Sequence, residues 1–133
     1  MVAPGSRREA RERALELLYE AESKDQTMVD VLDALVVEPD AFARDVAAGV
    51  DEHRTRIDEL LTKLATDWPL DRMAVLDRAV LRMGVYELLE RPDVPTAVVL
   101  DEAVELAKRY STEESGRFVN GVLAAAAAEL RPT

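Results

Sequence analysis

Cysteine is absent from the 133 residues of this sequence, and histidine occurs only once. Without a thiol the chain has no disulfide framework, no thiolate nucleophile and no thiolate metal site, and this usage fits a reducing compartment. The longest apolar run, from Val122 to Ala128, is far too short to span a bilayer. The first residues, MVAPGSRR, lack the apolar core of a signal peptide. We therefore expect a cytoplasmic protein.

Signals of enzymatic chemistry are also missing. The sequence has no glycine-rich phosphate loop, no zinc-ligand spacing and no nucleophile elbow. The single histidine, His53, falls on an apolar helix face, where we interpret it as a core or boundary residue rather than a catalytic base. The sequence therefore predicts a protein that is not an enzyme, with no cofactor and no metal.

Apolar residues make up 48% of the chain, and its formal net charge is −10. A chain of this length and composition can form one domain that buries roughly two-thirds of its unfolded surface. Its acidity argues against a surface that binds polyanions everywhere. A nucleic-acid site must therefore be a confined basic patch.

Apolar positions recur at helical spacing between proline and polar breaks, and no sustained alternating pattern is present. The predicted fold class is all-α, with helices over residues 7–22, 27–35, 40–64, 73–89, 97–107 and 111–130. A bend is expected at Gly49, and the stretch from Met73 to Leu89, apolar on nearly every side, predicts a central buried helix. The segment DWPLDR, residues 67–72, is the predicted boundary between two parts of the domain.

Polar residues that favour helix N-termini support these starts. A capping box, in which a side-chain oxygen and a carboxylate three residues later bond reciprocal backbone N–H groups, needs Ser or Thr followed by Glu or Gln. The predicted caps are Ser6 with Glu9, Thr27, Asp40, and Ser111 with Glu114.

The first predicted helix begins with SRREARER, four arginines in eight residues of an acidic chain. At about 100° per residue, Arg7, Arg8 and Arg11 lie unopposed on one side of this helix. Arg13 lies beside Glu16 on the other side, which favours a surface ion pair. Cations at a helix N-terminus oppose the helix dipole, whereas guanidinium forks suit phosphate recognition. The pattern indicates either a polyanion site or a solvated basic face.

A second basic segment, KRYSTEESGRF, lies near the C-terminus. Its lysine and arginines flank Tyr110 and Phe118, an interleaving that suits the stacking of unpaired bases. The alternative is that both aromatic residues belong to the core. The residues alone leave these two interpretations open.

Three segments resemble the NusB family of transcription antitermination factors: residues 94–123, residues 77–88, and the arginine-rich start before ALELLYE. The resemblance implies about seven helices in two small bundles, here residues 1–66 and 67–133, with a short helix near Leu70. It also implies a function. Members of this family bind the boxA element of ribosomal RNA leader transcripts together with NusE, a small-subunit ribosomal protein, in a complex that prevents early termination by RNA polymerase.

The resemblance assigns roles to individual residues. The residues that match the family's RNA-binding positions are Arg7, Arg8, Arg11, Tyr110 and Phe118, and those that match positions facing the ribosomal protein are Tyr19 and Asp77. Glu9 departs from the family pattern, because it interrupts the arginine motif where relatives can carry another basic residue.

Two residues of the central helix, Arg82 and Tyr86, have one-turn spacing. They are either a further part of these surfaces or, for Arg82, a partner for buried carbonyls or for Glu87.

Two other functions fit the sequence. One is a helical adaptor that binds only proteins, and the other is a stand-alone copy of the NusB-like domain that some RNA methyltransferases carry. The chain is too short to include a methyltransferase domain, which disfavours the latter. Because relatives form both monomers and dimers, a homodimer is also compatible with the resemblance.

Overall fold

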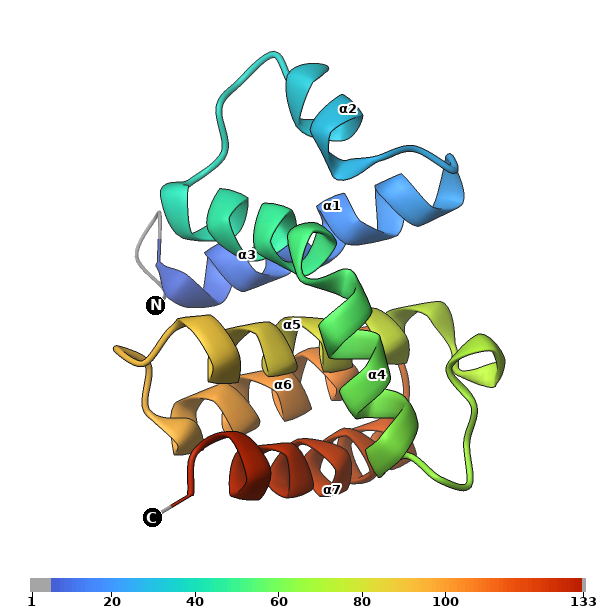
Figure 1. Cartoon of the computed structure of the whole chain (residues 1–133). Coiled ribbons are helices and arrows are strands. Elements are labelled where there is room, and N and C mark those ends of the chain that lie inside the picture. Colours follow the sequence, from blue (N-terminus) through green and yellow to red (C-terminus); the bar gives the residue numbers. More distant parts are fainter. Residues whose placement is uncertain (1–5, 133) are drawn as a thin grey trace.

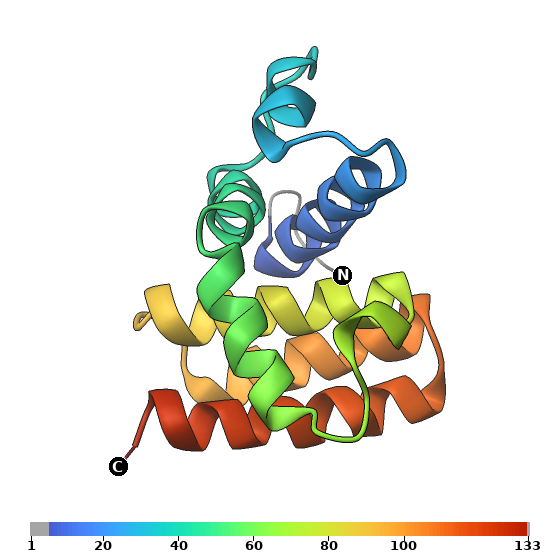
Figure 2. The ribbon, with the colours of Figure 1, turned by 45° about the vertical axis from the view of Figure 1, so that its right-hand side comes forward.

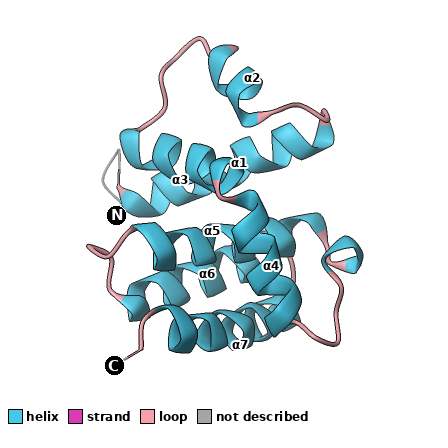
Figure 3. Cartoon of the chain, in the orientation of Figure 1, coloured by secondary structure: helices cyan, strands magenta, loops and turns pink. Residues whose placement is uncertain are grey.

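The computed structural model describes residues 6–132, and within them the chain is helical with no strand (Figure 3). The elements are α1 (Arg7–Ser23), α2 (Met28–Asp33), α3 (Ala41–Glu52), α4 (Arg54–Leu64), a single 3-10 turn η1 (Leu70–Arg72), α5 (Val75–Glu90), α6 (Thr96–Tyr110) and α7 (Glu113–Leu130). The all-α class is confirmed, and η1 is the short helix expected near Leu70. No helix in this part of the chain has the length and apolar character needed to cross a membrane.

The helices form two layers (Figure 1). Helices α1, α2 and α3 pack together in one layer, and α5, α6 and α7 pack together in the other. Figure 2 shows α4 descending from the first layer onto the second, where it packs against α5 and α7. The division between residues 66 and 67 stays a prediction, and these contacts of α4 favour a second bundle that begins at residue 54.

Helix α5 is the centre of the molecule, because it contacts α1 and α3 on one side and α6 and α7 on the other. Its residues 79–88 are all buried. A helix enclosed by five others, α4 included, has no solvent face along these residues, which is why its sequence is apolar on nearly every side. The predicted central helix is therefore confirmed. Two of its buried residues are nevertheless charged, Arg82 and Glu87.

Three of the four predicted helix caps are confirmed. The side chains of Ser6, Thr27 and Asp40 accept hydrogen bonds from the backbone N–H groups of Glu9, Asp30 and Phe42 at 3.2, 3.1 and 2.9 Å. The fourth is wrong by one residue. Thr112 rather than Ser111 caps α7, accepting from the Ser115 N–H at 3.0 Å, because this helix begins at Glu113.

The long helix predicted over residues 40–64 is wrong, because it divides into α3 and α4 at His53. The His53 ring nitrogen Nδ1 lies 2.9 Å from the Gly49 carbonyl oxygen, which fixes the half-buried imidazole at this corner. Gly49 lies inside α3 rather than at the break. A Cβ at this position would lie 2.2 Å from the ring of Tyr86, so the glycine permits close packing of α3 on α5.

Candidate nucleic-acid interface

The N-terminal turn of α1 lies beside the α5–α6 loop and α6, and its first two arginines are half exposed. Arg7 pairs with Asp93 at 3.4 Å, and the Arg8 guanidinium makes a forked contact with the Glu102 carboxylate at 3.2 Å. The hydrogen bond to Glu102 raises the pKa of Arg8. The expectation that these arginines are unopposed is therefore wrong, since each has a carboxylate partner from another part of the chain.

Arg11 lies inside the protein rather than on its surface. Its guanidinium donates to both Glu87 carboxylate oxygens, at 3.0 and 2.7 Å, and each side chain is 3% exposed. The helical periodicity of α1 places Arg11 in the same column as the apolar residues that pack on α5. The interpretation of Arg11 as a surface cation is wrong, because Glu87 on α5 offers it a buried carboxylate.

A cluster of guanidinium groups surrounds the buried ring of Phe42 at the start of α3. The guanidinium carbons of Arg7, Arg91 and Arg11 lie 4.4, 4.8 and 5.1 Å from the ring centroid, within the range of cation–π attraction. Arg91 also pairs with Asp93 at 2.9 Å, and this hydrogen bond lowers the pKa of Asp93 to about 2. Sequence reasoning missed Arg91, since only the fold brings it beside Arg7.

Glu12 joins α1 to the C-terminal end of α6. Its Oε2 atom accepts hydrogen bonds from Arg109 Nη1 at 2.7 Å and from the Tyr110 hydroxyl at 2.6 Å. The bond from Tyr110, with a further contribution from Arg109, lowers the pKa of Glu12, and the same bond raises the pKa of Tyr110. Tyr110 is 40% exposed, so it is not a core residue, whereas Phe118 is half-buried against the core.

The residues expected to face a protein partner line two hollows beside this region. Tyr19, 47% exposed, borders an apolar pocket of about 240 Å³ together with Leu76 and Tyr110. Asp77 borders a larger groove of about 810 Å³ that also contains Phe118. Each hollow therefore combines one residue from the expected RNA side with one from the expected partner side.

The larger groove contains an aromatic side chain that sequence reasoning missed. Trp68, which lies before η1, is 53% exposed and lines the groove with Asp77 and Phe118. Asp77 accepts a hydrogen bond from the Ser115 hydroxyl at 2.9 Å through Oδ2, and its other oxygen is buried with no hydrogen-bond partner. The lone tryptophan in a loop was the only available signal for this wall of the groove.

Arg13 matches its sequence interpretation, whereas Arg82 does not. Arg13 pairs with Glu16 at 3.5 Å on the exposed side of α1. Arg82 is buried and makes a forked ion pair with Asp58 of α4 at 2.8 and 3.0 Å. Its partner is therefore this carboxylate, and neither Glu87 nor a buried carbonyl. Tyr86 is also buried and donates to Asp45 at 2.9 Å. These contacts give both α5 residues structural roles.

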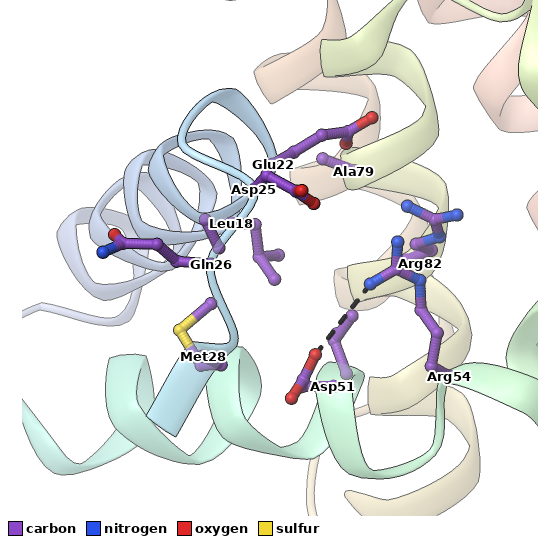
Figure 4. A pocket seen from close by; sticks show the side chains of 11 residues that line it. Leu18, Glu22, Asp25, Gln26, Met28, Asp51, Arg54, Ala79 and Arg82 are labelled. Atoms are coloured by element: carbon purple, nitrogen blue, oxygen red, sulfur yellow. Dashed lines mark ion pairs between the residues drawn. The ribbon is translucent and has the colours of Figure 1, made fainter. Parts of the chain in front are cut away.

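A separate hollow of about 230 Å³ lies between α1, α2, α3, α4 and α5 (Figure 4). Its lining combines the charged Asp25, Arg54 and Arg82 with apolar residues such as Met28. Both arginines pair with Asp58, Arg54 at 3.5 Å and Arg82 at 2.8 Å. None of the predicted site residues lines this hollow, so the candidate interface is the surface formed by α1, α6 and the start of α7.

Comparison with known proteins identifies the family. The sequence model described as the NusB family matches residues 8–128. The chain is 48% identical over 132 residues to the transcription antitermination protein NusB of Kineococcus radiotolerans, covering 96% of each chain. It is 51% identical over 123 residues to that of Thermobifida fusca, covering 90% of this chain and 87% of the relative.

Solved structures show the same fold. T. maritima NusB superposes with a TM-score of 0.84 at 37% identity, covering 97% of this chain and 94% of that one. A crystal structure of the antitermination factors NusB and NusE in complex with dsRNA matches with a TM-score of 0.74 at 28% identity, covering 92% of this chain and 96% of the other.

Proposed function

The chain belongs to the NusB family, and from this premise we propose that it is a transcription antitermination factor that binds boxA-type RNA of ribosomal RNA leader transcripts together with the ribosomal protein NusE. It acts by binding rather than by catalysis, in the cytoplasm, as a component of an RNA polymerase complex. The solved complex of related NusB with NusE and dsRNA supports both partners.

The observation that carries the RNA side is that α1 brings Arg8 beside Arg109, near the C-terminal end of α6, while Arg7 lies beside the α5–α6 loop. Arg8 and Arg109 line the same narrow cleft between α1 and α6. A phosphate at this cleft accepts hydrogen bonds from both guanidinium forks. Tyr110 presents a partly exposed ring on which an unpaired base can stack.

Two of the other RNA-side residues take different roles in this proposal. Phe118 lines the 810 Å³ groove and offers a second stacking surface, separate from that of Tyr110. Arg11 supports the interface indirectly, because its ion pair with Glu87 docks α1 on α5 and so places Arg7 and Arg8 at the surface.

The partner side of the proposal rests on Tyr19, Leu76 and Asp77. An apolar pocket beside the exposed carboxylate of Glu16 suits a protein segment that presents an apolar side chain next to a basic one. Tyr19→Ala should weaken NusE binding, measured by calorimetry, without loss of helicity. Val29→Ala on α2 is the matched control, because Val29 is also exposed but lies outside the pocket.

The RNA side is tested by titrating labelled boxA RNA and a scrambled RNA, with and without NusE. Arg8→Ala should weaken boxA binding and reduce the salt slope by about 0.7, the value for one phosphate of a single strand. Arg13→Ala is the matched control, because the two side chains are similarly exposed, 50% and 42%, and Arg13 pairs only along α1. Equal damage by both variants, or equal affinity for boxA and scrambled RNA, would overturn the proposal.

A further inference from the structure

Glu12 occupies a central position between the two proposed binding surfaces. It lies one turn after Arg8 on α1, and its Oε2 atom holds both Arg109 at 2.7 Å and Tyr110 at 2.6 Å. Its side chain is 23% exposed, whereas Arg109 is 59% exposed. One partly buried oxygen on α1 therefore fixes two consecutive, solvent-facing side chains of α6.

The two donors face different surfaces. Arg109 lines a narrow cleft between α1 and α6 with Arg8 and Glu102. Tyr110 lines the apolar pocket with Tyr19 and Leu76. Glu12 lines both hollows and is the residue that they share. A change in the position of the Tyr110 hydroxyl can therefore reach Arg109 through a single carboxylate, that of Glu12.

We propose that Glu12 is a positioning residue that couples occupation of the apolar pocket by the protein partner to RNA binding at Arg8 and Arg109. This inference rests on the proposed function. A partner side chain that fills the pocket packs on the pocket-facing side of the Tyr110 ring and leaves its other side open to a base. This contact immobilises the Tyr110 hydroxyl, the hydroxyl fixes the Glu12 carboxylate, and the carboxylate fixes the Arg109 guanidinium. RNA then binds an arginine whose rotamer is already selected.

The expected size of this coupling follows from the ordering of one long side chain. Immobilising a rotamer-rich side chain costs an amount that corresponds to roughly a 2- to 10-fold change in affinity. The partner should therefore tighten RNA binding by about this factor through Glu12. By linkage, RNA should tighten partner binding by the same factor.

The competing mechanism is electrostatic competition, in which Glu12 merely occupies Arg109 until a phosphate displaces it. The two mechanisms differ in sign. Under competition, removal of the carboxylate strengthens RNA binding equally with and without the partner. Under positioning, its removal abolishes the extra affinity that the partner confers.

The experiment measures the Kd of labelled boxA RNA with and without saturating NusE. The coupling ratio is the Kd without NusE divided by the Kd with NusE, so a ratio above one means that NusE tightens RNA binding. Tyr110→Phe keeps the ring but removes the hydroxyl, and Glu12→Ala removes the shared acceptor. Both should lower the ratio by about 2- to 10-fold, whereas Glu12→Gln, which keeps an acceptor oxygen, should restore most of it. Glu20→Gln is the matched control, because Glu20 also lies on α1 but pairs with Lys24 and lines neither hollow.

A wild-type coupling ratio that Tyr110→Phe and Glu12→Ala leave unchanged would overturn the role of Glu12 and leave the proposed function standing. Tighter RNA binding by Glu12→Ala and Glu12→Gln in the absence of NusE would establish competition instead. A wild-type protein that binds no boxA RNA even with NusE would overturn the proposed function and the coupling together. Equal melting temperatures of the variants exclude unfolding as the cause of a lost ratio.

Discussion

Arg11→Met tests whether this arginine is a surface ligand of RNA or a buried structural residue that holds α1 on α5. The substitution removes two hydrogen bonds, 3.0 and 2.7 Å long, to a carboxylate that is 3% exposed. Removing one partner of a buried ion pair typically costs about 3–5 kcal/mol, because the other is left without compensation. At this chain length that loss corresponds to a fall in melting temperature of roughly 10–20 °C.

A double variant separates the cost of breaking the Arg11–Glu87 ion pair from the net contribution of that pair to stability. Arg11→Met combined with Glu87→Leu replaces both charges by apolar side chains in the same enclosed space. Such replacements are often neutral or stabilising, so the double variant should recover to within about 1 kcal/mol of the wild type. The coupling free energy between the two sites should then be close to the sum of the costs of the two single substitutions, Arg11→Met and Glu87→Leu.

The assay is urea unfolding followed by far-UV circular dichroism, with the RNA titration performed on the same samples. The double variant should bind RNA nearly as well as the wild type, because Arg7 and Arg8 are still presented by a docked α1. If Arg11→Met unfolds within about 1 kcal/mol of the wild type and yet loses RNA binding, Arg11 acts as a phosphate ligand and the structural assignment is wrong.

Three further predictions follow from local geometry. Gly49→Ala should destabilise the protein by about 1–3 kcal/mol or more in urea unfolding, because its Cβ would meet the buried Tyr86 ring at 2.2 Å. Gly121→Ala is the control: with nothing within 4 Å, it should stabilise α7 by about 0.5–1 kcal/mol. Equal effects of the two substitutions would refute the packing role of Gly49. Burial raises the pKa of Tyr86, so the stabilising contribution of the neutral phenol is present below the unfolded pKa of about 10 and is lost as pH rises beyond that value. Phenolate absorbance should show that Tyr86 ionises only together with alkaline unfolding. Tyr86→Phe should remove this ionisation from the absorbance titration. The Arg91 hydrogen bond lowers the pKa of Asp93 to about 2, so its contribution is present above the unfolded value of about 3.9 and is lost as pH falls through 2; a carboxyl titration by NMR near 3.9 would contradict the pair.

The helices and three of their caps were predictable because they depend on neighbours in the sequence. Ser6, Thr27 and Asp40 each act on backbone groups within three residues. The break at His53 was not predictable in the same way, because the apolar pattern continues across it without a proline. What ends α3 is the need for α4 to turn onto α5 and α7, and that is a tertiary requirement.

The arginines show the same limit more sharply. Helical periodicity correctly separated Arg13 from the basic side of α1, but it said nothing about what faces that side. Glu87 is 76 residues from Arg11, and Glu102 is 94 residues from Arg8. A periodicity argument has no access to partners at such separations. Helical periodicity therefore predicted that Arg7, Arg8 and Arg11 are unpaired, whereas each is paired with a carboxylate.

That pairing bears on how so acidic a chain can recognise RNA. A phosphate that reaches Arg8 exchanges one ion pair for another, because Glu102 already holds the guanidinium fork. The net electrostatic gain is the difference between the two pairs, and the displaced carboxylate remains nearby and repels the strand. Charge alone therefore favours binding only weakly. On the proposed function, contacts other than phosphate, such as base stacking on Tyr110 and ordering of Arg109 by the protein partner, must supply the remaining affinity.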